Sequence, residues 1–290
     1  MRSRAEAVSA GTFPQGEALR VDGRTGELLW VDMIGGSFHL GRYADDVLAT
    51  TFSARVGDRI GMVAPLEEPG AGWVVAAGSQ LLHVDAAGTS RVLLDDITPD
   101  DTHPLNDGIC SPDGSLWVGS QSGRRDPTSA LYRIGTDLSV TTELTGVTVS
   151  NGIAFNADGT TLYYIDTLPH RRLEAFDVHG GTLHNRRTIA VLDGANPDGL
   201  ALDDTGCVWV AMWDGHEVRR VSPDGEIVGV VEVPVPRPTA VALTDGRLFV
   251  TTASMGLDPV PAGSGRIFAA QVDASAPPTP PFRGRLKEAP

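Results

Sequence analysis

Residues 28–32 read LLWVD, and this short apolar run around an aromatic residue is repeated along the chain. The equivalent runs are GWVVAA at 72–77, SLWVGS at 115–120, TLYYID at 161–166, CVWVAM at 207–212 and RLFVTT at 247–252. Their aromatic residues lie 43, 44, 46, 46 and 40 positions apart, a period typical of one small structural unit per repeat. The chain is therefore expected to contain six such units.

Each repeat also carries the signals of antiparallel strands. Asp-Gly or Thr-Gly turns precede four of the aromatic runs, and a further strand-like segment follows every run. Helical periodicity is missing from these segments. The pattern predicts an all-β fold, a six-bladed β-propeller with four-stranded antiparallel blades around a central channel, in preference to a solenoid or to a β-sandwich with accidental spacing.

The sequence predicts different structures for the two ends of the chain. A strand near Ala5 to Ala10 is expected to complete the last blade and close the ring. Residues 274–290 contain APPTPP at 276–281, followed by charged residues, a composition typical of disorder. We expect a single propeller domain over residues 1–273 and a Pro-rich disordered tail over residues 274–290.

Composition limits the partners. The 290 residues include 37 acidic and 23 basic side chains, for a net charge of −14, which disfavours binding to nucleic acid or to anionic membranes. An apolar run of about 18 residues and the core of a signal peptide are both missing, so we expect a cytoplasmic protein, monomeric or weakly homo-oligomeric. Cys110 and Cys207 belong to no Cys cluster and are expected to be buried thiols.

The innermost strand of each blade lines the channel of a propeller, so residues at the start of that strand meet at one mouth. In four repeats this position carries an oxygen-bearing side chain, and in the other two it falls near Arg59 and Pro238. The four motifs are Gly16-Glu17, Asn106-Asp107, Asn151-Gly152 and Asp198-Gly199. Several carboxylates brought to one axis need a compensating charge, which a bound cation would supply.

Glu17, Asn151 and Asp198 are therefore the predicted ligands of one divalent metal ion. Carboxylate and amide oxygens favour Ca²⁺, while Zn²⁺, Mn²⁺, Mg²⁺ and Fe²⁺ are further candidates. Three protein ligands leave positions for water and substrate. Taken singly, each residue has an ordinary alternative, because Asn-Gly and Asp-Gly are common turn dipeptides and Glu17 can be a solvated loop residue.

The same segments resemble the senescence-marker-protein/gluconolactonase family, often called regucalcin-like, over about residues 5–272. The resemblance is carried by GEALRVDGRTGELLWVD, NDGICSPDGSLWVGS, SNGIAFNADGTTLYYIDT and PDGLALDDTGCVWVAMWDG. It implies a six-bladed propeller with one axial metal held by Glu17, Asn151 and Asp198. It also implies hydrolysis of a small sugar-derived lactone such as an aldonolactone.

Further roles follow from this resemblance and from the chemistry. The resemblance implies that Asn106 contacts substrate or metal-bound water, and Asp198 is the candidate general base as well as a ligand. Asp107 is a candidate for orienting water or substrate, with packing beside the channel as the alternative. Many relatives carry Arg where this chain has Pro104, and His103 is the candidate replacement donor, unless it is a solvated loop residue.

Two other functions stay open at this point. The same metal site would suit a hydrolase of phosphotriesters or of nonsugar lactones, or the metal would be structural in a calcium-binding propeller without activity. A GxSxG nucleophile motif and an HExxH zinc motif are missing from the sequence. Trp213 is a candidate for the channel mouth or for covering a blade edge.

Overall fold

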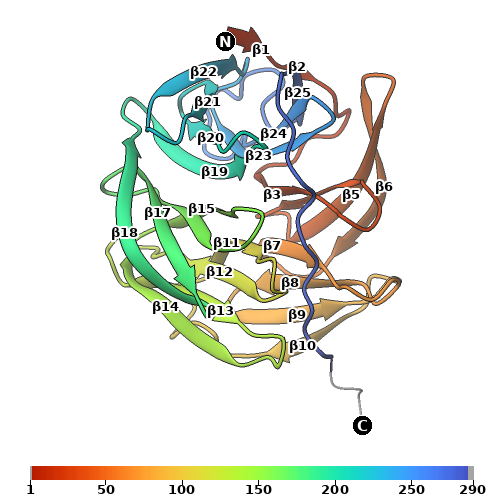
Figure 1. Cartoon of the computed structure of the whole chain (residues 1–290). Coiled ribbons are helices and arrows are strands. Elements are labelled where there is room, and N and C mark those ends of the chain that lie inside the picture. The colour runs from red at the N-terminus through yellow and green to blue at the C-terminus, as the bar shows by residue number, and fades with distance from the viewer. Residues whose placement is uncertain (1, 287–290) are drawn as a thin grey trace.

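The computed structural model describes residues 2–286 as six small β-sheets arranged in a ring around a channel (Figure 1). In this part of the chain every regular element is a strand. It therefore contains no helix that is long and apolar enough to cross a membrane. The predicted six-bladed β-propeller is confirmed.

Each blade begins with its innermost strand and proceeds outward along the chain. The first contains β3 (Gly16–Val21), β4 (Leu28–Asp32), β5 (Ser37–Ala44) and β6 (Val47–Arg55). The second contains β7 (Ile60–Pro65), β8 (Trp73–Ala77), β9 (Gln80–Val84) and β10 (Ser90–Leu94). The third contains β11 (Leu105–Cys110), β12 (Leu116–Ser120), β13 (Ser129–Ile134) and β14 (Val140–Val147). The fourth contains β15 (Ser150–Phe155), β16 (Thr161–Asp166), β17 (Arg172–His179) and β18 (Thr182–Val191). The fifth contains β19 (Asn196–Leu202), β20 (Val208–Trp213), β21 (Glu217–Val221) and β22 (Ile227–Glu232).

The sixth blade joins the two ends of the propeller. Its inner strands are β23 (Pro238–Thr244), β24 (Arg247–Thr252) and β25 (Phe268–Gln271), and its outer strand is β2 (Glu6–Ala7), antiparallel to β25. The expected closure of the ring by an N-terminal strand is thus confirmed. The sequence did not predict β1 (Arg2–Arg4), which adds a parallel fifth strand to the fifth blade beside β22.

The repeated aromatic residues occupy the second strand of each blade and pack between blades. Trp30, Trp117, Trp209 and Phe249 are fully buried. Trp30 and Phe249 share one apolar cluster, which joins the first blade to the sixth. These large apolar surfaces hold neighbouring blades together and so fix the position of the innermost strands.

All six innermost strands carry a β-bulge, and the bulges fall at the same level of the channel. The register with the second strand shifts between Glu17 and Arg20, Ile60 and Met62, Leu105 and Gly108, Ser150 and Ile153, Pro197 and Leu200, and Pro238 and Val241. A bulge interrupts the ordinary alternation of a strand and redirects side chains. The predicted ligand motifs lie in or beside these bulges.

Glycine follows two of the candidate ligands because the inner strands approach closely there. A Cβ on Gly152 would lie 2.6 Å from the Asp198 carbonyl oxygen, and one on Gly199 would lie 2.7 Å from the Thr239 carbonyl oxygen. Such distances are too short for any side chain. The glycines of the Asn-Gly and Asp-Gly pairs are therefore required by close packing around the axis and not by a turn, since both pairs lie within strands.

Residues 274–286 cross the face of the propeller seen in Figure 1 and do not behave as the disordered tail that we expected. We call this segment the strap. Its main-chain N–H groups at Thr279, Phe282 and Arg283 donate hydrogen bonds to carbonyls of Val21, Pro65 and Gly114. The Phe282 side chain is fully buried. The expectation of disorder is wrong for these residues, because main-chain hydrogen bonds and one buried apolar side chain hold the segment in place. A Pro-rich segment also loses little conformational entropy when it becomes ordered. Residues 287–290 lie outside the described part of the chain.

Candidate active site

A cavity of about 300 Å³ opens where the inner strands begin, at the opposite end of the channel from the strap. The candidate ligands Glu17, Asn151 and Asp198 line it together with Asn106. Its other walls include Gln15, Arg59, Gln121, Arg125, Thr167, Asn196, Trp213 and Met255. Four residues that are distant in sequence and were singled out from the repeat thus share one cavity, since each stands at the same place in its own blade.

The two carboxylates in this cavity are buried and unfavourable when ionised. Burial raises the pKa of Glu17 to about 8, and the negative charge of Asp107 adds to the shift, against a hydrogen bond from Gln15. Burial also raises the pKa of Asp198 well above its usual value, with Glu17 and Asp107 contributing further. The ionised forms of these two buried acids repel each other, and a positive charge between them would stabilise both.

The polar atoms around these acids are incompletely paired. Asp198 Oδ1 and Gln15 Oε1 are both buried without a hydrogen-bond partner among the described residues. Gln15 Nε2 donates to Glu17 Oε1 at 3.3 Å. Buried oxygen atoms without donors are costly in a folded protein, and a set of carboxylate and amide oxygens suits a hard divalent cation.

Asn106 and Asn151 are fixed in orientation by a short network. Asn106 Nδ2 donates to the Ser150 carbonyl at 2.7 Å and to Asn151 Oδ1 at 2.9 Å. Asn151 Nδ2 donates to Thr167 Oγ1 at 2.7 Å, and Thr167 donates in turn to the Pro197 carbonyl at 2.8 Å. Because its nitrogen is held by Thr167, Asn151 keeps its oxygen available, with one lone pair beyond the bond from Asn106.

Two of the sequence candidates lie outside this cavity wall. Asp107 is buried in an ion pair with Arg20, at 2.7 Å, and also accepts a hydrogen bond from the Gly108 N–H. This pairing corresponds to the packing alternative for Asp107, although its charge still acts on Glu17 and Asp198. His103 hydrogen-bonds Asp100 and Thr128, each at 2.8 Å, in a loop that does not line the cavity.

Comparison with known proteins decides the family. The profile of the SMP-30/Gluconolactonase/LRE-like region matches residues 15–254. This chain belongs to that family. An L-arabinolactonase of Azospirillum brasilense is 31% identical to this SMP-30/gluconolactonase family member over 276 residues, which cover 90% of this chain and 89% of the relative.

Other relatives agree with this assignment. A 6-deoxy-6-sulfogluconolactonase of Pseudomonas putida is 32% identical over 235 residues, covering 78% of this chain and 79% of the relative. Among solved structures, a calcium-binding protein, regucalcin, from Agrobacterium tumefaciens superimposes with a TM-score of 0.88, at 22% identity and with 99% of both chains covered. That structure supports the fold.

Some cavity residues of this family member were not assigned a role from the sequence. Thr167 follows the TLYYID run directly, a signal that marks the end of a strand and nothing more. Arg59 stands at the position of the second blade that corresponds to the ligand motifs, which was the available signal. Arg125 belongs to the loop between β12 and β13 and has no repeat partner. Trp213 lines the cavity, as one of its two interpretations predicted.

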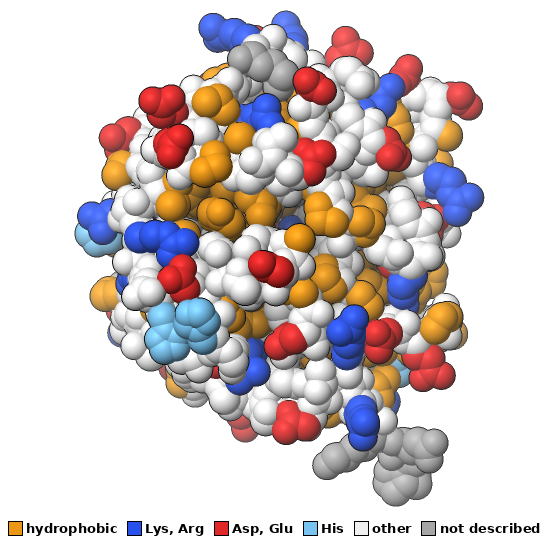
Figure 2. Space-filling model, viewed as in Figure 1, with side chains coloured by type: hydrophobic (Ala, Val, Ile, Leu, Met, Phe, Trp, Pro, Cys, Tyr) orange, Lys and Arg blue, Asp and Glu red, His pale blue; other side chains and the backbone are white. Residues whose placement is uncertain are grey.

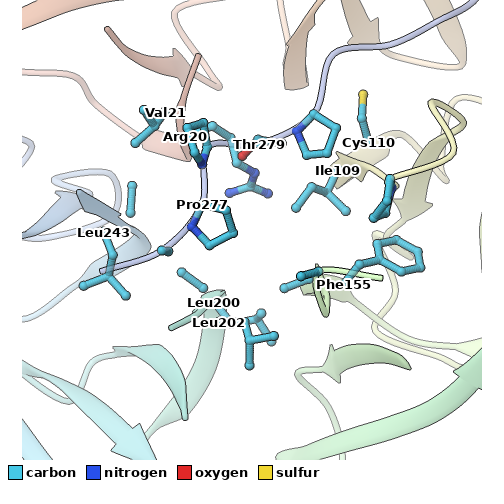
Figure 3. A pocket seen from close by; sticks show the side chains of 18 of the residues that line it. Arg20, Val21, Ile109, Cys110, Phe155, Leu200, Leu202, Leu243, Pro277 and Thr279 are labelled. Atoms are coloured by element: carbon cyan, nitrogen blue, oxygen red, sulfur yellow. The ribbon is translucent and has the colours of Figure 1, made fainter. Parts of the chain in front are cut away.

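A second cavity, of about 260 Å³, lies at the other end of the channel of this propeller (Figure 3). Its walls come from the far ends of the inner strands and from the strap, which crosses it at Pro277 and Thr279. Figure 2 shows hydrophobic side chains gathered in the middle of that face. Most of the lining is apolar, and neither Glu17 nor Asp198 contributes to it.

Proposed function

We propose that this protein is a divalent-metal-dependent hydrolase that opens a small lactone. The observation that carries the proposal is that Glu17, Asn151 and Asp198 line one cavity, where Asp198 Oδ1 is buried and accepts no hydrogen bond from the described residues. Membership in a family whose relatives include proteins named as lactonases supports the choice of reaction. Sugar-derived lactones are the proposed substrate class.

Glu17, Asn151 and Asp198 would hold the cation, and their donor set fits it. Two carboxylates and one amide oxygen meet the preference of Ca²⁺, which is the ion we propose, in line with the calcium-binding description of the Agrobacterium regucalcin. When bound, the ion supplies Lewis-acid polarisation of the lactone carbonyl and stabilises the developing oxyanion charge.

The side chains of this chain perform the remaining tasks. Asp198 accepts a proton from the water whose oxygen bonds to the lactone carbonyl carbon. When the ester C–O bond breaks, this proton passes to the ring oxygen, and the product is the hydroxy acid. Asn106 lies beside Asn151, where its amide contacts the substrate or the attacking water. Trp213 and Met255 provide apolar wall at the cavity and limit access of bulk water.

The decisive experiment follows lactone hydrolysis by proton release on metal-stripped protein after addition of Ca²⁺, Mn²⁺, Mg²⁺, Zn²⁺ or Fe²⁺. We expect one ion to restore hydrolysis of an aldonolactone and Glu17→Gln to abolish both that activity and tight binding of the ion, measured by calorimetry. The matched control is Glu226→Gln, which changes an exposed carboxylate that does not line the cavity.

Other outcomes would redirect the proposal. Activity that survives complete removal of metal would contradict the metal-dependent mechanism. Hydrolysis of a phosphotriester panel with no hydrolysis of lactones would assign a different substrate to the same site. Tight ion binding with no hydrolysis of either panel would support a calcium-binding propeller.

A further inference from the structure

Two guanidinium groups line the candidate active site without forming an ion pair in the described part of the chain, and the charge of Glu17 acts on one of them, Arg59, from a longer distance. Arg59 precedes β7, Arg125 lies in the loop after β12, and both line the cavity. Among residues 2–286, neither forms an ion pair with a carboxylate. Arg237, which lies over the ring of the cavity residue Trp213, is by contrast paired with Asp214 at 2.7 Å.

Arg59 gives the stronger evidence for a bound ligand, because part of its guanidinium group is buried. Its Nε is buried and has no hydrogen-bond partner within the described residues. A buried N–H group without an acceptor is unfavourable, and the usual resolution is a ligand or an ordered water that accepts the bond. A planar guanidinium also matches the two oxygens of a carboxylate or sulfonate better than it matches a single hydroxyl.

The balance of charge inside the cavity favours the same kind of ligand. Its walls carry two acids, Glu17 and Asp198, and two bases, Arg59 and Arg125. A divalent cation held by the two acids would cancel their charge, and the two guanidinium groups would then give the cavity a positive excess. This local excess contrasts with the net charge of −14 for the whole chain.

We infer that Arg59 and Arg125 form an anion subsite that selects lactones bearing a second, negatively charged group, such as the carboxylate of an aldaric acid lactone. The inference rests on the proposed lactonase function and names its substrate class. Arg59 donates to the anionic group from inside the cavity, and Arg125, which is exposed, adds charge at the rim. Both act by binding and positioning the substrate, and neither touches the scissile bond.

The test compares two lactones that differ at one carbon. D-Glucono-1,4-lactone ends in a hydroxymethyl group, and D-glucaro-1,4-lactone ends in a carboxylate at the same place. We expect Arg59→Gln to lower kcat/KM for the acidic lactone by about tenfold more than for the neutral one, mainly through KM, as expected for loss of a charge-assisted hydrogen bond. Arg125→Gln should change the same ratio in the same direction by less, because its charge is exposed to water. Added salt should weaken the preference of the unmodified protein for the acidic lactone.

Arg124→Gln is the matched control, because Arg124 is the exposed neighbour of Arg125 and does not line the cavity. It should leave the ratio of the two kcat/KM values unchanged. Equal losses on both lactones in Arg59→Gln and Arg125→Gln, or a ratio no different from that in Arg124→Gln, would overturn the subsite while leaving lactone hydrolysis intact.

A binding measurement separates this inference from the proposed function. Calorimetric titration with D-glucarate and D-gluconate should show preferential binding of the diacid that is lost in Arg59→Gln. If the protein hydrolyses neither lactone but keeps that preference, the subsite stands and the lactonase function fails. If hydrolysis and preferential binding are both missing in protein shown to be folded by circular dichroism, the subsite is overturned as well.

Discussion

The two ends of the channel share the inner strands β3, β11, β15 and β19 and hold cavities of similar size, about 300 Å³ and about 260 Å³. At one end, bulges direct carboxylate and amide groups to the axis, and some of their atoms have no partner. At the other end the strands resume ordinary alternation and present apolar residues such as Leu202 and Leu243, which the strap crosses (Figure 3). The chemical character of the lining, and not the size of the cavity, therefore distinguishes the two ends.

Arg20 and Asp107 separate the two ends. Arg20 Nη2 donates to Asp107 Oδ1 at 2.7 Å and to the Gly108 carbonyl at 3.0 Å, and the side chains are only 8% and 6% exposed. Arg20 lines the apolar cavity, while Asp107 acts electrostatically on the acids of the polar one. The pair thus provides a polar partition within the channel.

Removing one member of this partition should have the largest effect. We expect Asp107→Ala to lower the free energy of unfolding by about 3–5 kcal/mol, because Arg20 would be left buried without its counter-charge. Urea unfolding measures the change. The double variant Arg20→Met/Asp107→Leu should lose much less, and a loss as large as that of the single variant would argue that the pair contributes packing and not charge balance.

The next effect distinguishes the polar end by activity. We expect Asp198→Asn to lower kcat/KM for the lactone by about 10²–10³-fold, because the side chain loses both a charge and a proton acceptor. A matched change at the apolar end, Leu243→Met, should stay within about twofold of the unmodified protein, because it preserves the apolar lining. Comparable losses in the two variants would remove the distinction between the ends.

Asp198→Asn, which should lower activity, should make the metal-free protein more stable. The folded-state pKa of Asp198 is raised, so ionisation of this acid costs stability at every pH above its unfolded-state pKa. Asn carries no charge and avoids that cost. Metal-free Asp198→Asn should therefore unfold at a higher temperature than the metal-free unmodified protein at pH 7, and at the same or a lower temperature once both are supplied with the ion.

Stability at the apolar end depends on the strap. Phe282→Ala removes a fully buried ring, but it should lower the free energy of unfolding by no more than about 3 kcal/mol. The loss has this limit because the terminal strap can detach locally while the rest of the propeller stays folded. Thermal unfolding measures this change. Detachment would also open the cavity at Cys110, whose thiol is buried and lines it, so faster labelling by a thiol reagent should accompany the loss. Unchanged labelling would mean that the strap does not cover this thiol.

The contrast between the ends also explains what the sequence could predict. The aromatic run and its period depend on local strand pattern, and they led to six blades and to the level at which Glu17, Asn106, Asn151 and Asp198 meet. The strap escaped prediction because its order depends on one buried residue, Phe282, and on hydrogen bonds to three other blades. Composition describes neither kind of contact.

The repeat pattern also could not predict which side chains form hydrogen bonds with one another. The repeat places Asp107 beside Asn106 at the mouth, yet Asp107 turns to Arg20, a residue 87 positions earlier in the chain. The same holds for Thr167, which follows β16 of the fourth blade and donates to the Pro197 carbonyl in the fifth. Strand periodicity gives the level of a residue along the channel, whereas its hydrogen-bond partner is decided by packing between blades.

The smallest effect is expected from the charged edge of the strap. Arg283 Nε contacts Glu67 Oε1 at 2.8 Å, with side chains 44% and 57% exposed, so water screens the pair. Arg283→Ala should cost less than about 1 kcal/mol in thermal unfolding, and the loss should shrink further at high salt. A loss comparable to that of Phe282→Ala would mean that charge, and not the buried ring, holds the strap across the channel. A small loss would leave apolar burial as the reason that the strap lies across this end of the channel.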